Sequence, residues 1–103
     1  MNGMLQTRVG MTTYLTPAGA IGEAGEMAAL KQAVEEHLRL HQGNLVLDLG
    51  RTPSVQSAAL ESLLDIHDEL ARAGGSLQVT NANALLRDIF LVSGFSDYVE
   101  VSD

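Results

Sequence analysis

Cysteine and tryptophan are absent from the sequence, and all aromatic residues together make up 4% of it. Without thiols the chain can form no disulfide, no thiolate metal site and no cysteine nucleophile, which is typical of a reducing compartment. Long apolar runs are also missing, because none approaches the roughly 18 residues of a membrane-spanning helix. Residues 1–10 contain no apolar core of a signal peptide. We therefore expect a cytoplasmic protein with no membrane insertion.

Positive charge is scarce as well. Six Lys and Arg residues stand against 13 Asp and Glu residues, which gives a formal net charge of −7. A chain of this charge is repelled by a phosphate backbone, and no cluster of basic residues offsets the repulsion locally. The composition therefore argues against a nucleic-acid partner.

The hydrophobic pattern predicts one α/β domain over residues 1–103, because 46% hydrophobic content in a chain of this length suffices for one core. Alternating or continuous apolar residues predict strands at 5–9, 13–17, 45–49, 77–79 and 99–101. Helical spacing predicts helices from near Glu23 to the break at Gln42, from 57 to 73, and from 85 to just before Gly94. The order β-β-α-β-α-β-α-β indicates a mostly parallel central sheet with an N-terminal antiparallel hairpin. Strand 45–49, apolar almost throughout, is expected at its centre.

Metal ligands are few. His37 and His41 stand four residues apart and would share one helix face, the geometry of two zinc ligands. A third ligand is missing nearby, and residues 38–40 between them lack the glutamate of a zinc-protease motif. We therefore expect no metal and interpret His37 and His41 as solvated or half-buried helix histidines. His67 lies among the apolar positions of helix 57–73 and is interpreted as a core-edge histidine bonded to a neighbour.

Phosphate-binding and catalytic patterns are equally weak. Gly19, Gly22 and Gly25 precede a helix, but their spacing matches neither the dinucleotide nor the P-loop pattern, so we interpret them as turn and packing glycines. Ser57 has neither a glycine-flanked elbow nor a histidine close in sequence. Acidic pairs on exposed helix faces are interpreted as solubilising charge: Glu35 with Glu36, and Asp65 with Asp68. We expect no enzyme and no cofactor, and a small-molecule or nucleotide site at the turn before helix 57–73 is the least favoured alternative.

A protein-contact surface is predicted at that same turn. Small and polar side chains at the start of the helix leave the backbone open to close approach by a partner. The candidate contact residues are Ser54, Gln56, Ser57, Ala58, Ala59 and Glu61. A purely structural interpretation, in which Ser57 is the N-cap of the helix, is about as well supported, and the two roles can coexist.

These residues resemble the STAS domain of bacterial anti-sigma factor antagonists. The resemblance covers about residues 5–102 and is carried by the strand 44–49, the run Gln56-Ser57-Ala58-Ala59-Leu60 with Leu63-Leu64, the helix end and strand 71–79, and the segment 85–98. It implies a single STAS-like domain. The family signature at the turn is Asp-Ser-Ser-Gly or Asp-Ser-Ala-Gly, and Ser57 falls on the serine that follows the aspartate.

The resemblance also implies a function. In that family the serine is phosphorylated by a partner kinase that is itself an anti-sigma factor, and a phosphatase restores the binding form. By similarity, Ser57 is the phosphoacceptor, and the unmodified protein binds a histidine-kinase-like anti-sigma factor as a monomer or weak dimer. A phosphoryl group would add nearly two negative charges to the contact surface and so switch binding.

Three positions depart from the family pattern. Gln56 replaces the signature aspartate, Ala59 replaces the glycine, and Gly22 stands where a second family aspartate is expected, with Glu23 beside it. The alternative is therefore a STAS scaffold that is not phosphorylated. Such a domain would be an accessory subunit of a sensory assembly or a lipid-transport system.

Overall fold

The computed structural model describes residues 4–22, 25–40 and 43–102. Its elements follow the predicted order: β1 (Leu5–Val9), β2 (Thr12–Thr16), α1 (Gly25–Leu40), β3 (Asn44–Asp48), α2 (Ser57–Arg72), β4 (Ser76–Thr80), α3 (Ala84–Val92), a 3-10 helix η1 (Phe95–Asp97) and β5 (Glu100–Ser102). The strands form one sheet in the order β1-β2-β3-β4-β5. β1 and β2 are antiparallel and all other neighbours are parallel, so the predicted fold class and the central place of β3 are confirmed.

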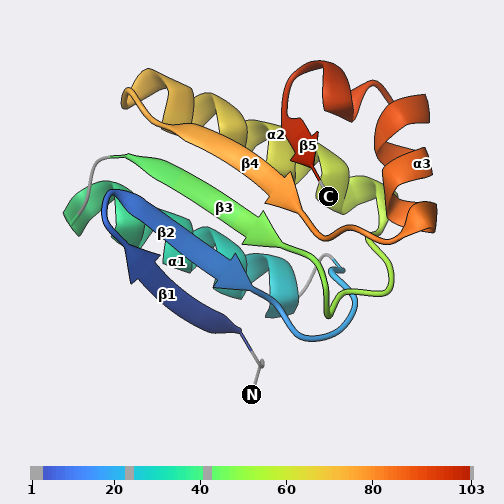
Figure 1. Cartoon of the computed structure of the whole chain (residues 1–103), viewed down its shortest axis with the longest axis horizontal. Coiled ribbons are helices and arrows are strands. Elements are labelled where there is room, and N and C mark those ends of the chain that lie inside the picture. The colour runs from blue at the N-terminus through green and yellow to red at the C-terminus, as the bar shows by residue number, and fades with distance from the viewer. Residues whose placement is uncertain (1–3, 23–24, 41–42, 103) are drawn as a thin grey trace.

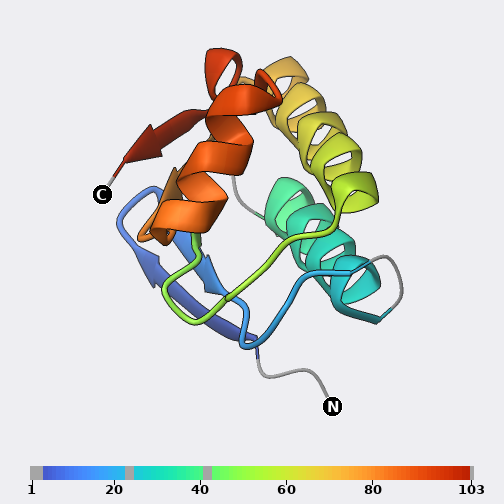
Figure 2. The ribbon, with the colours of Figure 1, turned by 90° about the vertical axis from the view of Figure 1, so that its right-hand side faces the viewer.

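The sheet has helices on one face only. The parallel connections are right-handed, and each successive strand is added at the same edge of the sheet. The crossover helices therefore all lie on one face. α1 and α2 lie side by side there, and α3 lies at the end of the sheet near β4 and β5 (Figures 1 and 2). None of the described helices covers the opposite face, which is turned to the viewer in Figure 1.

The core lies between the sheet and the helices. Alternate strand residues point into it, for example Leu45 and Leu47 of β3, which are almost completely buried. On α2 the buried positions recur at helical spacing: Ala59, Leu63, Ile66 and Leu70. The rings of Phe90 and Phe95 pack at a centroid distance of 4.7 Å and close the core at the end of α3. The 3-10 helix that places Phe95 there was not predicted from the sequence.

A two-residue loop joins β1 and β2. Val9 pairs with Thr12, so Gly10 and Met11 form the turn. Gly10 has φ of +61°, a left-handed conformation that glycine adopts without strain. The predicted hairpin is therefore present, although Pro17 falls just beyond the end of β2.

Candidate functional site

The loop between β3 and α2 lies at the carboxyl ends of the parallel strands and is held by a short stretch of extra pairing. Ile21 and Val55 form an isolated parallel bridge. The Ile21 amide donates to the Ser54 carbonyl at 3.0 Å, and the Gln56 amide donates to the Ile21 carbonyl at 3.0 Å. Beside them the buried Thr52 hydroxyl lies 3.3 Å from the Pro17 carbonyl oxygen and donates to it. The chain just before α2 is therefore fixed by a segment more than thirty residues earlier.

Asn83 holds the other side of this loop. Its Oδ1 accepts a hydrogen bond from the Leu86 amide at 2.8 Å, which makes it the N-cap of α3. Its Nδ2 donates to the Pro53 carbonyl at 3.2 Å. One amide side chain thus caps α3 and joins that helix to the loop before α2. An asparagine two residues before the predicted start of this helix is the signal from which the cap could have been found in the sequence.

Asn83→Ala is expected to lower the free energy of unfolding by about 1 kcal/mol, the usual cost of a lost N-cap. Asn83→Asp is the matched control, because a carboxylate keeps the acceptor for Leu86 but cannot donate to Pro53. Urea denaturation followed by circular dichroism measures both variants. We expect the aspartate variant to be clearly more stable than the alanine variant, and equal losses in the two would show that the cap contributes nothing.

α2 begins at Ser57, and the cap position belongs to Gln56. Gln56 has extended dihedrals (φ −73°, ψ 153°), and its side chain makes no capping hydrogen bond. The interpretation of Ser57 as the N-cap is therefore wrong: Ser57 is the first helical residue. Its exposed side chain makes no hydrogen bond within the described part of the chain.

The first turn of α2 forms the positive end of a long helix. A helix offers no internal partner to its first amides, here those of Ser57 and Ala58, and the aligned peptide dipoles make this end attractive to negative charge. The first turn of α2 contains no acidic residue. The Ser57 hydroxyl therefore stands where a phosphoryl group would find hydrogen-bond donors and meet no like charge in that turn.

Five of the six candidate contact residues are exposed at this helix start: Ser54, Gln56, Ser57, Ala58 and Glu61. The sixth, Ala59, is 1% exposed and belongs to the core. The reason is helical periodicity, which puts Ala59 on the same face as Leu63. The expectation that Ala59 contacts a partner is therefore corrected. The five exposed residues together form the Ser57 surface.

A shallow hollow of about 330 Å³ adjoins the loop. Residues from the ends of β3 and β4 and from the loop line it: Leu49, Gly50, Arg51, Thr52, Pro53, Asn81 and Asn83. Near it, Asp48 Oδ1 accepts hydrogen bonds from the Gly50 amide at 2.9 Å and from Asn81 Nδ2 at 3.1 Å. The lining offers the guanidinium of Arg51 and the side-chain amides of Asn81 and Asn83.

The histidines lie away from this site. His37 is buried, and its Nδ1 lies 3.0 Å from the Thr13 hydroxyl, so it is not the solvated or half-buried residue expected from the sequence. The half-buried His67 has a buried Nδ1 without a hydrogen-bond partner in the described structure, so the bonded neighbour expected there is not found. His41, the other member of the candidate pair, lies outside the described residues. Across those described residues, no three His, Asp or Glu side chains come together as metal ligands.

The remaining candidates have structural roles or fall outside the description. The acidic pairs are exposed as predicted: Glu35 with Glu36, and Asp65 with Asp68. Gly19 turns the chain with φ of +94° and donates its amide to the Arg51 carbonyl. Gly22 is buried directly after the Ile21 bridge, while Glu23 lies outside the described residues.

The comparisons with known proteins agree with this architecture. A family model described as "Mlab, STAS domain" matches residues 8–100. The structure is similar to an anti-sigma factor antagonist from Mycobacterium paratuberculosis, with 19% identity and a TM-score of 0.83 over 99% of this chain and 86% of that one. It is also similar to SpoIIAA, described as an anti-sigma factor antagonist, in its unphosphorylated form, with 12% identity and a TM-score of 0.75 over 98% and 88%. The phosphorylated form of SpoIIAA, a Bacillus cell fate determinant, gives 14% identity and a TM-score of 0.71 over 98% and 92%. No curated protein matches the sequence significantly.

The match over residues 8–100 shows the family: this chain belongs to the STAS domains. Among the described residues, none of the helices has the length and apolar character needed to cross a membrane.

Proposed function

We propose that this chain is a switchable protein-binding module in which the Ser57 surface binds a histidine-kinase-like anti-sigma factor and Ser57 is the phosphoacceptor. One observation carries the proposal: the Ser57 side chain is exposed, without a hydrogen-bond partner among the described residues, at the positive end of a sixteen-residue helix. The domain would act in the cytoplasm and use no cofactor. A partner phosphatase would return it to the binding form.

The proposed switch requires no refolding. A phosphoryl group on Ser57 would bring nearly two negative charges, which the amides of the first turn of α2 can accept. The loop before it is already fixed by the Ile21 bridge and by Asn83, so the fold need not rearrange around the group. In a complex, however, the same charges would be buried against the partner, and desolvating them without a counter-charge is costly. Phosphorylation would thus leave the domain folded and abolish its binding.

The second candidate is a scaffold that binds its partner permanently, in a sensory assembly or a lipid-transport system. Two observations favour it. Gln56 is exposed and uncharged at the position of the signature aspartate, and Gly22 is buried at the position of the second family acid. If those acids serve kinase recognition, this chain would bind without being modified.

The deciding experiment incubates the full chain with ATP and each histidine-kinase-like anti-sigma factor of its source organism. Intact mass and complex formation are measured for the wild type, for Ser57→Ala and for Ser54→Ala, a neighbouring exposed serine. We expect a mass gain of one phosphoryl group in the wild type and in Ser54→Ala, and none in Ser57→Ala. Binding without any mass gain would favour the scaffold, whereas a gain that persists in Ser57→Ala would place the phosphoacceptor elsewhere.

A further inference from the structure

The two edges of the sheet differ in how they are protected. β5 has only three residues and carries Glu100, and short, charged strands resist pairing with another chain. β1 has five residues, continuous pairing with β2 and neither proline nor lysine. Its single charged residue, Arg8, lies on the helix side of the sheet, where Nη1 donates to the Thr13 hydroxyl at 2.8 Å. Among the described residues, no strand pairs with the free side of β1, and none of the usual protection is present there.

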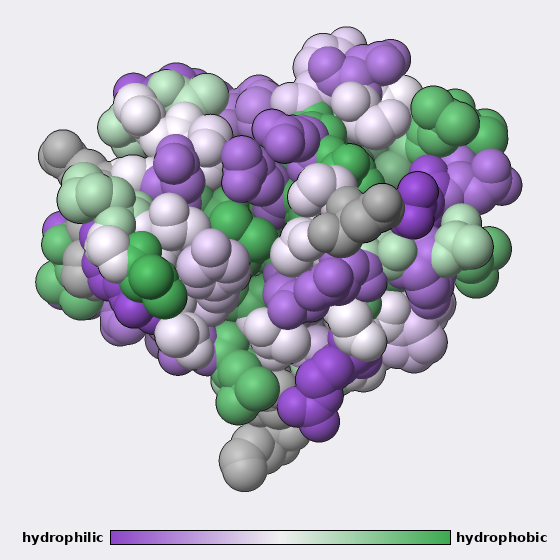
Figure 3. Space-filling model, in the orientation of Figure 1, coloured by the Kyte–Doolittle hydropathy of each residue, from purple (hydrophilic) through white to green (hydrophobic). Residues whose placement is uncertain are grey.

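The uncovered face of β1 is mostly apolar, with Thr7 between Leu5 and Val9. Leu5 and Val9 are 55% and 64% exposed, and Tyr14 of β2 lies beside them on the same face at 38%. Hydrophobic side chains gather among polar ones on this face of the molecule, including over the β1–β2 hairpin (Figure 3). Monomeric proteins seldom leave an apolar strand at an unprotected edge, because it favours association.

The charge distribution indicates which partner fits this edge. Residues 1–22 contain no Asp or Glu, and Arg8 is their only charged side chain, so all 13 acidic residues lie at position 23 or later. Two copies of a chain with net charge −7 repel each other over most of their surfaces. The β1–β2 hairpin is the part where two copies can meet without bringing carboxylates together.

The sequence of β1 is also complementary to itself. When two copies pair antiparallel about a two-fold axis at Thr7, Leu5 of each copy lies opposite Val9 of the other on the uncovered face. On the helix face Gln6 lies opposite Arg8 of the second copy. This register pairs all five residues of β1. A shift of this pairing by one residue would place the apolar face of one β1 strand beside the polar face of the other. A pairing centred on Arg8 would set the two arginines opposite each other.

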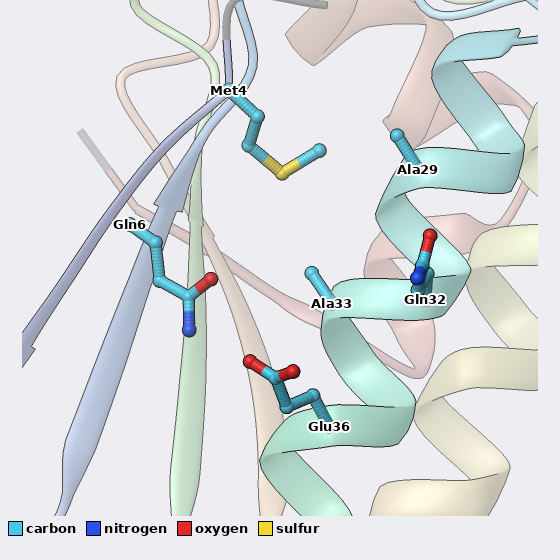
Figure 4. A pocket seen from close by; sticks show the side chains of 6 residues that line it. All are labelled: Met4, Gln6, Ala29, Gln32, Ala33 and Glu36. Atoms are coloured by element: carbon cyan, nitrogen blue, oxygen red, sulfur yellow. The ribbon is translucent and has the colours of Figure 1, made fainter.

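A groove beside β1 suits the second copy's Arg8. This hollow of about 230 Å³ lies between the start of β1 and α1. It is lined by Met4, Gln6, Ala29, Gln32, Ala33 and Glu36. Gln6 and Glu36 point toward it from its two walls, and the short side chains of Ala29 and Ala33 leave room between them (Figure 4). Gln6 lies opposite Arg8 of the second copy in this register, so in the dimer that guanidinium exchanges the Thr13 hydroxyl of its own chain for the groove near Glu36. Within the described part of its own chain, Glu36 forms a weak exposed ion pair with Arg39 at 3.9 Å.

We propose that the chain forms a two-fold symmetric dimer in which β1 pairs antiparallel with β1 of a second copy, centred on Thr7, and joins the two sheets into one. The contact is small, so the dissociation constant is expected on the order of 10–100 µM. β1 lies at the opposite edge of the sheet from α3 and β5, and the dimer leaves both Ser57 surfaces uncovered. This dimer does not depend on the phosphorylation proposed above.

Sedimentation equilibrium on the full chain between about 5 and 500 µM tests the dimer, since this range brackets the expected dissociation constant. Thr7 is exposed, so Thr7→Lys and Thr7→Glu add only a surface charge to the monomer but set like charges opposite each other in the dimer. We expect each variant alone to associate at least about tenfold more weakly than the wild type. An equal mixture of the two is expected to associate again, because lysine then faces glutamate across the axis.

Val92→Lys is the control, because it adds the same charge to an 81% exposed apolar residue on α3. We expect this variant to associate like the wild type. Circular dichroism and thermal unfolding of the three variants confirm that the monomer fold is intact. A wild type that stays monomeric throughout the range, a mixture that fails to associate, or a dimer abolished by Val92→Lys but not by Thr7→Lys would overturn the proposal.

Discussion

Leu63→Ala is expected to lower the free energy of unfolding by about 3 kcal/mol, with a comparable loss for Leu47→Ala. Leu63 is completely buried on the core face of α2, and Leu47 is 1% exposed on the central strand of the sheet. Truncating either side chain removes buried apolar surface and leaves a cavity that the packed neighbours fill only in part. Urea denaturation monitored by circular dichroism gives the free energies directly.

The control for this loss is Leu85→Ala, the same substitution at a leucine that is 58% exposed on α3. Its effect is expected to stay within about 0.5 kcal/mol, as is that of Ser57→Ala, because neither side chain is buried in the core. The Ser57 substitution should cost less than a lost cap, since Gln56 occupies the cap position. Comparable losses at Leu63 and Leu85 would mean that the packing described for the core is wrong.

Ser57→Glu is expected to weaken binding to the anti-sigma factor by about 100-fold or more, while Ser57→Ala changes it only slightly. The glutamate places a charge at the centre of the Ser57 surface, and burying it without a counter-charge costs several kcal/mol. In the free domain the same carboxylate lies at the positive end of α2 and should not reduce stability. Isothermal titration calorimetry with the purified partner measures the difference.

Ser102→Glu serves as the matched control for charge, because Ser102 is an exposed serine on β5 at the edge of the sheet. Its binding is expected to equal that of the wild type. If Ser57→Glu also binds like the wild type, the Ser57 surface is not where the partner docks. Loss of binding in Ser57→Ala as well would instead mean that the hydroxyl itself makes an essential contact, as in the permanent scaffold.

Local patterns predicted the elements well. The helix 57–73 was predicted within one residue of α2, because its apolar residues recur at helical spacing and Gly74 and Gly75 follow it. The run 45–49 was recognised as the central strand because a nearly continuous apolar run is typical of a strand covered on both faces. In the described structure helices cover only one face of β3, and Val46 is nonetheless only 6% exposed on the other. The 3-10 helix at Phe95 escaped prediction, since three residues are too few to display a period.

The sequence predicted where the candidate site lies but not the contacts that hold it in place. The exposed turn around Ser57 follows from its small and polar side chains, whereas the burial of Ala59 depends on the rotation of α2 against the sheet. The bridge between Ile21 and Val55 joins segments more than thirty residues apart. No periodicity within either segment signals such a contact.

The sequence by itself determined the strand and helix order and the antiparallel hairpin, because these depend on near neighbours along the chain. Only the tertiary structure decided that Thr52, Val55 and Asn83 fix the loop before α2, that His37 is buried against Thr13, and that β1 is left as an open edge. Each of these results from contacts between residues distant in sequence, whose partners are selected when the whole core packs.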